Sequence, residues 1–179
     1  VTGYGIIRDL NGKLSLLGVG VIRAAERGDT HPKRLSRILR GINKLLDLHI
    51  PDEVAIEAPF YGTNVQSMLK LGRVQGVVMA AAMQRDIPVA EYAPSKVKKA
   101  IAGNGKAAKE QLAAVLGQML PELKMHRDLP LDATDALAVA LCHYYQGNVP
   151  TSSGGGGGGK SKRYGSWDSF IEQNPDRLK

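Results

Sequence analysis

The alternation of strand-like and helix-like patterns constrains the fold of this chain most strongly. Strand-like runs at residues 3–8 and 14–22 flank Asn11-Gly12, a dipeptide typical of a tight hairpin turn. Short apolar runs then alternate with helical apolar spacing, with strand patterns at 53–57 and 88–92 and helix patterns at 33–48, 65–85, 109–120 and 134–145. The 53–57 run is apolar enough in its middle to predict a central strand. The order β-β-α-β-α-β-α-α predicts an α/β fold with a mixed sheet flanked by helices.

Composition divides the chain into three parts. Residues 1–150 hold every predicted element and suffice for one buried α/β domain. Residues 151–159 include six consecutive glycines and predict a flexible linker. Residues 160–179 place Trp167 and Phe170 among charges, which is too little apolar surface to fold alone. We expect a tail peptide that docks on the protein's own surface or on a partner.

Charge and cysteine content narrow the class of protein. The formal net charge of +7 favours a polyanionic partner such as nucleic acid, although many basic proteins bind none. Cys142 is the single cysteine, so it forms no intrachain disulfide and is typical of a small buried hydrophobe. No stretch approaches the roughly 18 apolar residues that span a bilayer, and no signal peptide is visible. We expect a cytoplasmic protein with no membrane partner.

Three carboxylates stand where metal ligands commonly stand. Glu57 ends the apolar run Val54-Ala55-Ile56, and Asp132 and Asp135 are three residues apart on one predicted helix. Magnesium prefers such oxygen ligands, and two ions about 4 Å apart can drive phosphodiester hydrolysis. A simpler interpretation stays open, because an N-cap Asp followed by an acid resembles a capping box and Glu57 suits an ion pair. The spacing of the two aspartates alone favours the cap.

Two further segments predict contacts with nucleic acid. Residues 94–109 contain no acid and five lysines, Lys96, Lys98, Lys99, Lys106 and Lys109. They predict a flexible cationic loop that grips phosphates, with an ordinary solvated surface as the alternative. Phe60 and Tyr61 follow Glu57 in a Pro-to-Gly loop, where a base could stack unless both rings pack beneath the loop.

The predicted helix at 65–85 is apolar on more than one face. One face can lie on the sheet and another can meet a second subunit. Gly72 and Gly76 would allow a close approach by a partner helix.

Four segments together resemble the bacterial RuvC-type Holliday junction resolvases. They are Thr2-Gly3-Tyr4-Gly5-Ile6-Ile7, Ala55-Ile56-Glu57, Leu69-Lys70-Leu71-Gly72 and Asp132-Ala133-Thr134-Asp135-Ala136-Leu137-Ala138, and the resemblance covers residues 1 to about 147. It implies a ribonuclease H-like fold, a homodimer packed through the helix at 65–85, and paired symmetric nicking of four-way DNA junctions in recombination and repair. It also implies a branch-migration helicase partner.

The resemblance assigns roles to individual residues. Glu57, Asp132 and Asp135 match the family's second, third and fourth metal-binding carboxylates, which implies magnesium (or manganese), with two ions per active site. Phe60 matches an aromatic that acts on bases at the junction. Lys98 and Lys109 match lysines important for handling and cleaving DNA.

One residue of the family pattern falls outside the sequence. The family's first catalytic Asp lies in an Ile-Asp-Pro-Gly strand a few residues before the Thr-Gly-Tyr-Gly segment, and Val1 stands between the two. The first strand of the domain is therefore expected to be missing or incomplete. Two alternatives stay open: a fragment that binds junctions with impaired catalysis, and a related ribonuclease H-like nuclease with another nucleic-acid substrate.

Overall fold

The computed structural model describes residues 1–59, 64–125 and 129–147, without the side chains of residues 109–110 and 124–125. The predictions for Phe60 and Tyr61, and those for the linker and the tail, lie outside the described residues.

The chain begins with the predicted hairpin. Strands β1 (Thr2–Leu10) and β2 (Lys13–Ile22) pair antiparallel, with Thr2 opposite Ile22. Asn11 and Gly12 have φ angles of 54° and 81°, the left-handed pair that a type I′ turn requires. The hairpin is therefore set by the dipeptide that predicted it.

A second, parallel pair follows. Strands β3 (Val54–Glu57) and β4 (Val89–Tyr92) run side by side, with Glu57 opposite Tyr92. The predicted central position of β3 is wrong for the described residues, where β3 hydrogen-bonds with β4 alone and the sheets are two separate pairs. A cavity of about 420 Å³ is lined by both β1 and β3, and this open space separates the hairpin from the parallel pair.

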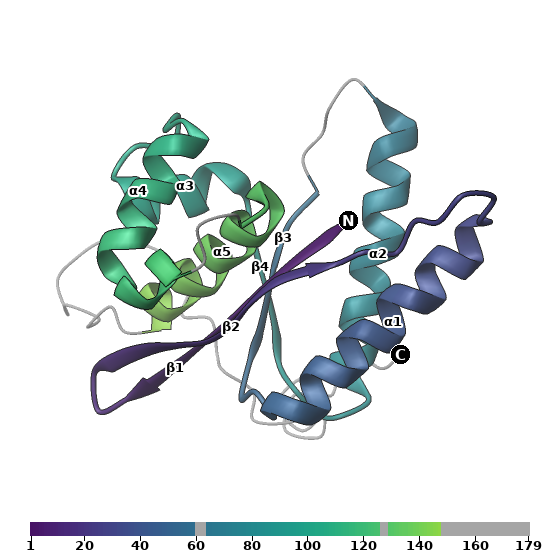
Figure 1. Cartoon of the computed structure of the whole chain (residues 1–179), viewed down its shortest axis with the longest axis horizontal. Coiled ribbons are helices and arrows are strands. Elements are labelled where there is room, and N and C mark those ends of the chain that lie inside the picture. Colours follow the sequence, from purple (N-terminus) through teal and green to yellow (C-terminus); the bar gives the residue numbers. More distant parts are fainter. Residues whose placement is uncertain (60–63, 126–128, 148–179) are drawn as a thin grey trace, which may run out of the picture. The chain divides into compact units, whose positions relative to one another are not determined.

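The helices form two groups (Figure 1). Helix α1 (His31–His49) packs against α2 (Val65–Met83), whereas α3 (Pro94–Ala102), α4 (Lys109–Met119) and α5 (Leu131–Gly147) pack together, with a short 3-10 helix at Pro121–Met125. The larger core holds fully buried Leu116, Leu120, Leu137, Leu141 and Cys142. The smaller one joins Ile38, Ile42 and Leu46 of α1 to Ala81 of α2. Cys142 is buried as predicted, and burial raises the pKa of its thiol.

Helix α3 replaces most of the predicted cationic loop, and that prediction is wrong. Pro94 does more than end β4: it occupies the first helical position, where its missing N–H is not needed. Val97 and Ile101 are four residues apart and both are buried, which fixes the helix on the core. Gly103, with φ at 71°, then ends it. Only the turn that follows stays non-helical before α4.

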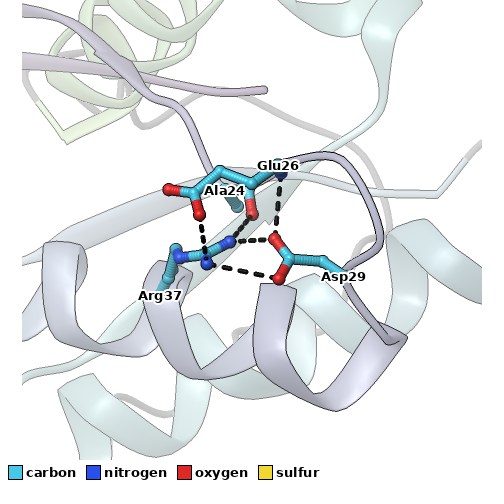
Figure 2. A network of polar contacts seen from close by, with 4 residues as sticks. All are labelled: Ala24, Glu26, Asp29 and Arg37. Atoms are coloured by element: carbon cyan, nitrogen blue, oxygen red, sulfur yellow. Dashed lines mark hydrogen bonds and ion pairs between the residues drawn. The ribbon is translucent and has the colours of Figure 1, made fainter.

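The connection from β2 to α1 is held by one arginine (Figure 2). The Arg37 guanidinium donates to the carbonyl of Ala24 at 3.0 Å, to the carboxylate of Glu26 at 2.7 Å and to both oxygens of Asp29. The Asp29 carboxylate also accepts the Glu26 N–H at 2.9 Å, and only 8% of this side chain is exposed. The guanidinium lowers the pKa of Asp29, so the carboxylate stays charged and the connection stays fixed.

Candidate active site

The three predicted carboxylates line one cavity. Glu57 reaches it from β3, and Asp132 and Asp135 reach it from α5. The rest of the wall includes the first residues of β1, apolar residues of α1 and α2, and the polar side chains of Glu53, Gln75 and His143. Residues more than seventy positions apart in the sequence therefore line the same cavity.

Glu57 is the last residue of β3 and lies where two parallel strands end together. The Ala58 N–H donates to the Tyr92 carbonyl at 2.8 Å, which extends the pairing one step past the strand. From the opposite side, the Gln75 side chain on α2 donates a hydrogen bond to the Glu57 carbonyl. The carboxyl ends of parallel strands are where sites commonly form in α/β proteins.

Asp132 and Asp135 are positioned by the close contact between α5 and β1. A Cβ on Gly3 would lie 1.8 Å from the Asp132 carbonyl oxygen, and a Cβ on Gly5 would lie 2.7 Å from the Leu137 Cα. Only glycine permits this approach. The two glycines alternate along β1 and so face the same side of the strand, a signal that could have predicted the helix contact from the sequence.

The predicted N-cap role of Asp132 does not match the helix start. Helix α5 begins at Leu131, and the Pro130 carbonyl already accepts the N–H of Ala133 at 2.9 Å. Asp132 thus lies inside the first turn. Its negative charge still favours the helix N-terminus, but no capping role is needed to explain it.

The three carboxylates are the type of ligand that a hard cation binds, but they are not arranged around a single cation position. Carboxylate oxygens are the ligands that magnesium prefers. Across the described part of the chain, no group of three or more His, Cys, Asp or Glu side chains is placed to hold a metal ion. Glu57, Asp132 and Asp135 therefore line the cavity without converging on one point.

A second polar group lines the same cavity and was not predicted. Glu53 and His143 are joined by a 2.5 Å contact between Oε2 and Nε2, and the other ring nitrogen of His143 lies 2.8 Å from the hydroxyl of Tyr92. Burial raises the pKa of Tyr92. His143 follows Asp135 by eight residues, so helical spacing places both on one face of α5 and could have indicated it.

The predicted lysines that the structure describes lie outside the cavity wall. Lys96, Lys99 and Lys106 are exposed and Lys98 is partly buried, while the side chain of Lys109 lies outside the described residues. The residues lining the cavity include none of the four described lysines. The connection runs through Tyr92, because Lys96 Nζ lies 5.1 Å from the centre of its ring.

Helix α2 exposes an apolar stripe on the side away from the cavity. Val65, Leu69 and Met83 are 57%, 50% and 63% exposed. A Cβ on Gly72 or Gly76 would meet no described atom within 4 Å. These five residues fall on one side of the helix, and we refer to them as the outer stripe. A helix with two apolar faces was predicted, and the structure confirms it.

The described helices include none with the length and apolar character needed to cross a membrane.

Comparison with protein families gives a match over most of the chain. The model described as crossover junction endodeoxyribonuclease RuvC matches residues 1–143. A protein of that name from Porphyromonas gingivalis is 48% identical, over 99% of this chain and 90% of its own length. One from Cytophaga hutchinsonii is also 48% identical, over 100% of this chain and 83% of its own. These alignments run beyond residue 147, so the resemblance extends past the segments that predicted it.

Solved structures agree with the sequence comparison. A Thermus thermophilus RuvC, described as in complex with Holliday junction substrate, has a TM-score of 0.73 and 31% identity, over 81% of this chain and 87% of the other. Another structure of the Thermus thermophilus protein gives a TM-score of 0.67 at 30% identity. The predicted ribonuclease H-like fold is therefore confirmed.

Proposed function

This chain belongs to the RuvC family of crossover junction endodeoxyribonucleases, and from that premise we propose that it resolves four-way DNA junctions. The proposed site is the cavity between β3 and α5. One observation carries this assignment: carboxylates from the end of a parallel strand and from the first two turns of a helix line the same space.

Glu57, Asp132 and Asp135 are the proposed ligands of magnesium or manganese, with two ions per site. When bound, these ions polarise a water and neutralise charge on the scissile phosphate. The chain's own contribution is to aim the carboxylates. Pairing with β4 fixes the end of β3, and the glycine contacts on β1 fix the start of α5.

The lysines around α3 are proposed to hold the DNA backbone. Lys96, Lys98, Lys99, Lys106 and Lys109 occupy the segment that follows Tyr92, and the contact of Lys96 Nζ with the Tyr92 ring supports this proposal. Phosphate contacts of this kind supply affinity and orientation without reading sequence. Phe60 and Tyr61, three and four residues after Glu57, are proposed to stack on bases.

Two subunits are proposed to act together, each cutting one strand. The outer stripe of α2 supports a homodimer. A monomer would leave this apolar face exposed to water, and its two glycines leave room for a partner helix to approach closely. A branch-migration helicase is the proposed partner in the cell, on the family resemblance alone.

The test of the site is the substitution Glu57→Gln. It removes the charge of a proposed metal ligand at almost constant volume, so we expect magnesium-dependent nicking to fall at least about 100-fold, beyond what losing a supporting contact costs. Junction affinity should stay nearly unchanged. Nicking of a labelled four-way junction and gel-shift titration measure the two effects.

The matched control is Glu91→Gln. Glu91 is an exposed carboxylate one residue before the end of β4, and it does not line the cavity. Its loss should leave both nicking and binding as they are. Full cleavage by the Glu57 variant, or equal losses in the two variants, contradicts the proposed site.

A second candidate function is a junction-binding protein with impaired catalysis. It is favoured by the observation that the three described carboxylates do not converge on one point. Under this alternative the chain binds four-way junctions but does not nick them with either metal. An added fourth carboxylate separates the two functions.

A further inference from the structure

Gln75 is the one buried polar residue among those the structure describes, at 8% exposure. It lies on α2 among Leu71, Val74 and Val78, which also line the cavity. A buried amide in apolar surroundings is costly unless it is hydrogen-bonded. Its side-chain nitrogen donates to the Glu57 carbonyl. The hydrogen bond to the Glu57 carbonyl on β3 therefore explains why a glutamine is buried here, whereas apolar packing alone does not.

We propose that Gln75 is a positioning residue that fixes the end of β3 and so aims the Glu57 carboxylate into the cavity. This inference rests on the proposed function. Pairing with β4 holds the backbone after Glu57 from one side, through the Ala58 N–H. Gln75 holds the Glu57 carbonyl from the other side. The two hydrogen bonds fix the peptide that follows the carboxylate-bearing residue, where the strand pairing ends.

The hydrogen bond also ties the site to α2. The same helix carries the outer stripe on another side, so any shift of α2 moves the donor that holds Glu57. Arg85, at the other end of this helix, bonds Asp47 at 2.8 Å and Asn43 at 3.0 Å on α1. The Arg85 contacts therefore hold the end of α2 on α1, and the Gln75 contact near the middle of α2 joins the helix to β3.

The discriminating substitution is Gln75→Met, which keeps length and packing but removes the donor. We expect nicking under single-turnover conditions to fall about 10- to 100-fold, the range found when a partner of a metal ligand is lost. Junction affinity should not change, and the magnesium midpoint should rise. A purely structural role would lower thermal stability and reduce binding and nicking in parallel, with no change in the midpoint. Gln75→Asn, too short to reach, should repeat the effect if the Met variant fails to fold.

Gln66→Met is the matched control, because Gln66 is an exposed glutamine on the same helix. Hydrogen exchange of the full chain supplies a readout that needs no cleavage. The Gln75 variants should speed exchange at the Glu57 and Ala58 amides, and the Gln66 variant should not. Unchanged exchange at both amides overturns the proposal.

The proposed nuclease function and the proposed role of Gln75 can be contradicted independently. If the parent chain does not nick junctions, the proposed function fails, and the exchange comparison alone decides whether Gln75 holds the end of β3. If the parent chain nicks and Gln75→Met nicks equally well at an unchanged magnesium midpoint, the positioning role is wrong while the nuclease assignment stands.

Discussion

Gly3 and Gly5 lack a Cβ atom, and this allows the close helix contact that positions Asp132 and Asp135. Helix α5 approaches β1 so closely that a Cβ at either position would meet its backbone. Asp132 and Asp135 lie on the stretch of helix that makes this contact. The Thr-Gly-Tyr-Gly segment, which the family resemblance singled out, therefore has a packing reason.

We expect Gly5→Ala to damage stability and nicking together. The new Cβ would lie 2.7 Å from the Leu137 Cα, so strand and helix must separate, at a cost of about 1–3 kcal/mol for overpacking. Thermal unfolding followed by circular dichroism measures the loss, and the junction assay measures the activity.

Gly117→Ala serves as the comparison for that substitution. Gly117 lies within α4, where an added Cβ meets no described atom within 4 Å, and alanine favours a helix by up to about 1 kcal/mol. Its stability should stay equal or rise. A Gly5 variant as stable as the parent would mean that α5 does not depend on this contact.

At the residue scale, the predicted residues belong to sequence patterns, whereas Gln75, Glu53 and His143 are revealed by their partners in the folded chain. Glu57, Asp132 and Asp135 were predicted because carboxylates beside apolar runs are conspicuous. Gln75 was not predicted, because a glutamine inside an apolar helix carries no pattern until its partner is known. That partner is a backbone carbonyl 18 residues earlier, which only the folded chain brings near.

At the scale of elements, α2 makes two different surfaces from one apolar helix. One side faces the cavity through Leu71, Val74 and Val78. The other is the outer stripe, exposed in the single chain. The sequence predicted two apolar faces but could not say which residues belonged to which, because that depends on how α1 and β3 meet the helix.

Leu69→Glu is expected to convert a dimer into monomers. A charge in the middle of the outer stripe would have to be buried without a partner, which is strongly unfavourable. Light scattering across a dilution series should show half the parent mass, with the fold preserved because Leu69 is already half exposed.

Lys70→Glu controls for the change in charge. Lys70 is the exposed neighbour of Leu69 on α2 but lies off the outer stripe, so this variant should keep the parent mass. A parent chain that is monomeric at every concentration contradicts the proposed dimer directly.

Helix α3 shows that a proline after a strand can begin a helix as well as a loop. Pro94 follows a strand and precedes five lysines, which together predicted a loop. The same residue is equally suited to start a helix, and Val97 and Ile101 decide the outcome by reaching the core. Two apolar positions are too few for periodicity to reveal, whereas α1, with six apolar residues in helical spacing, was predicted almost to its ends.

At the scale of the whole molecule, the space between the two strand pairs is the least expected feature. The cavity is lined on one side by residues 2–7 of β1 and on another by residues 53–57. The sequence predicted one mixed sheet. The hairpin and the strands at 53–57 and 88–92 are present as predicted, but the described strands form two separate pairs. The separation between the β1–β2 hairpin and the β3–β4 pair could not be predicted from the sequence of either pair alone.

We propose that this cavity receives a further strand carrying the fourth carboxylate. An upstream extension containing Ile-Asp-Pro-Gly should slow hydrogen exchange in β1 and β3, because their facing edges gain a ladder partner. It should also raise magnesium-dependent nicking above that of the chain beginning at Val1. Exchange and junction cleavage, compared between the two chains, measure these effects.

An extension with Asn in place of that Asp separates strand addition from catalysis. It should protect β1 and β3 to the same degree but add no nicking. Equal exchange in the extended and unextended chains would show that the cavity takes no strand, and equal nicking by both would show that no fourth carboxylate is needed.

Helix α5 carries both Asp132 and Asp135 at its start and fully buried Leu137, Leu141 and Cys142 further along. A substitution among these 17 residues is consequently tolerated only if it preserves both the fold and the site. Such a segment drifts slowly, and a library aimed at new cleavage preferences would lose most of its members there. The exposed lysines of α3 and of the turn after it are not part of the core, so substitutions there can change the affinity for junctions without loss of the fold.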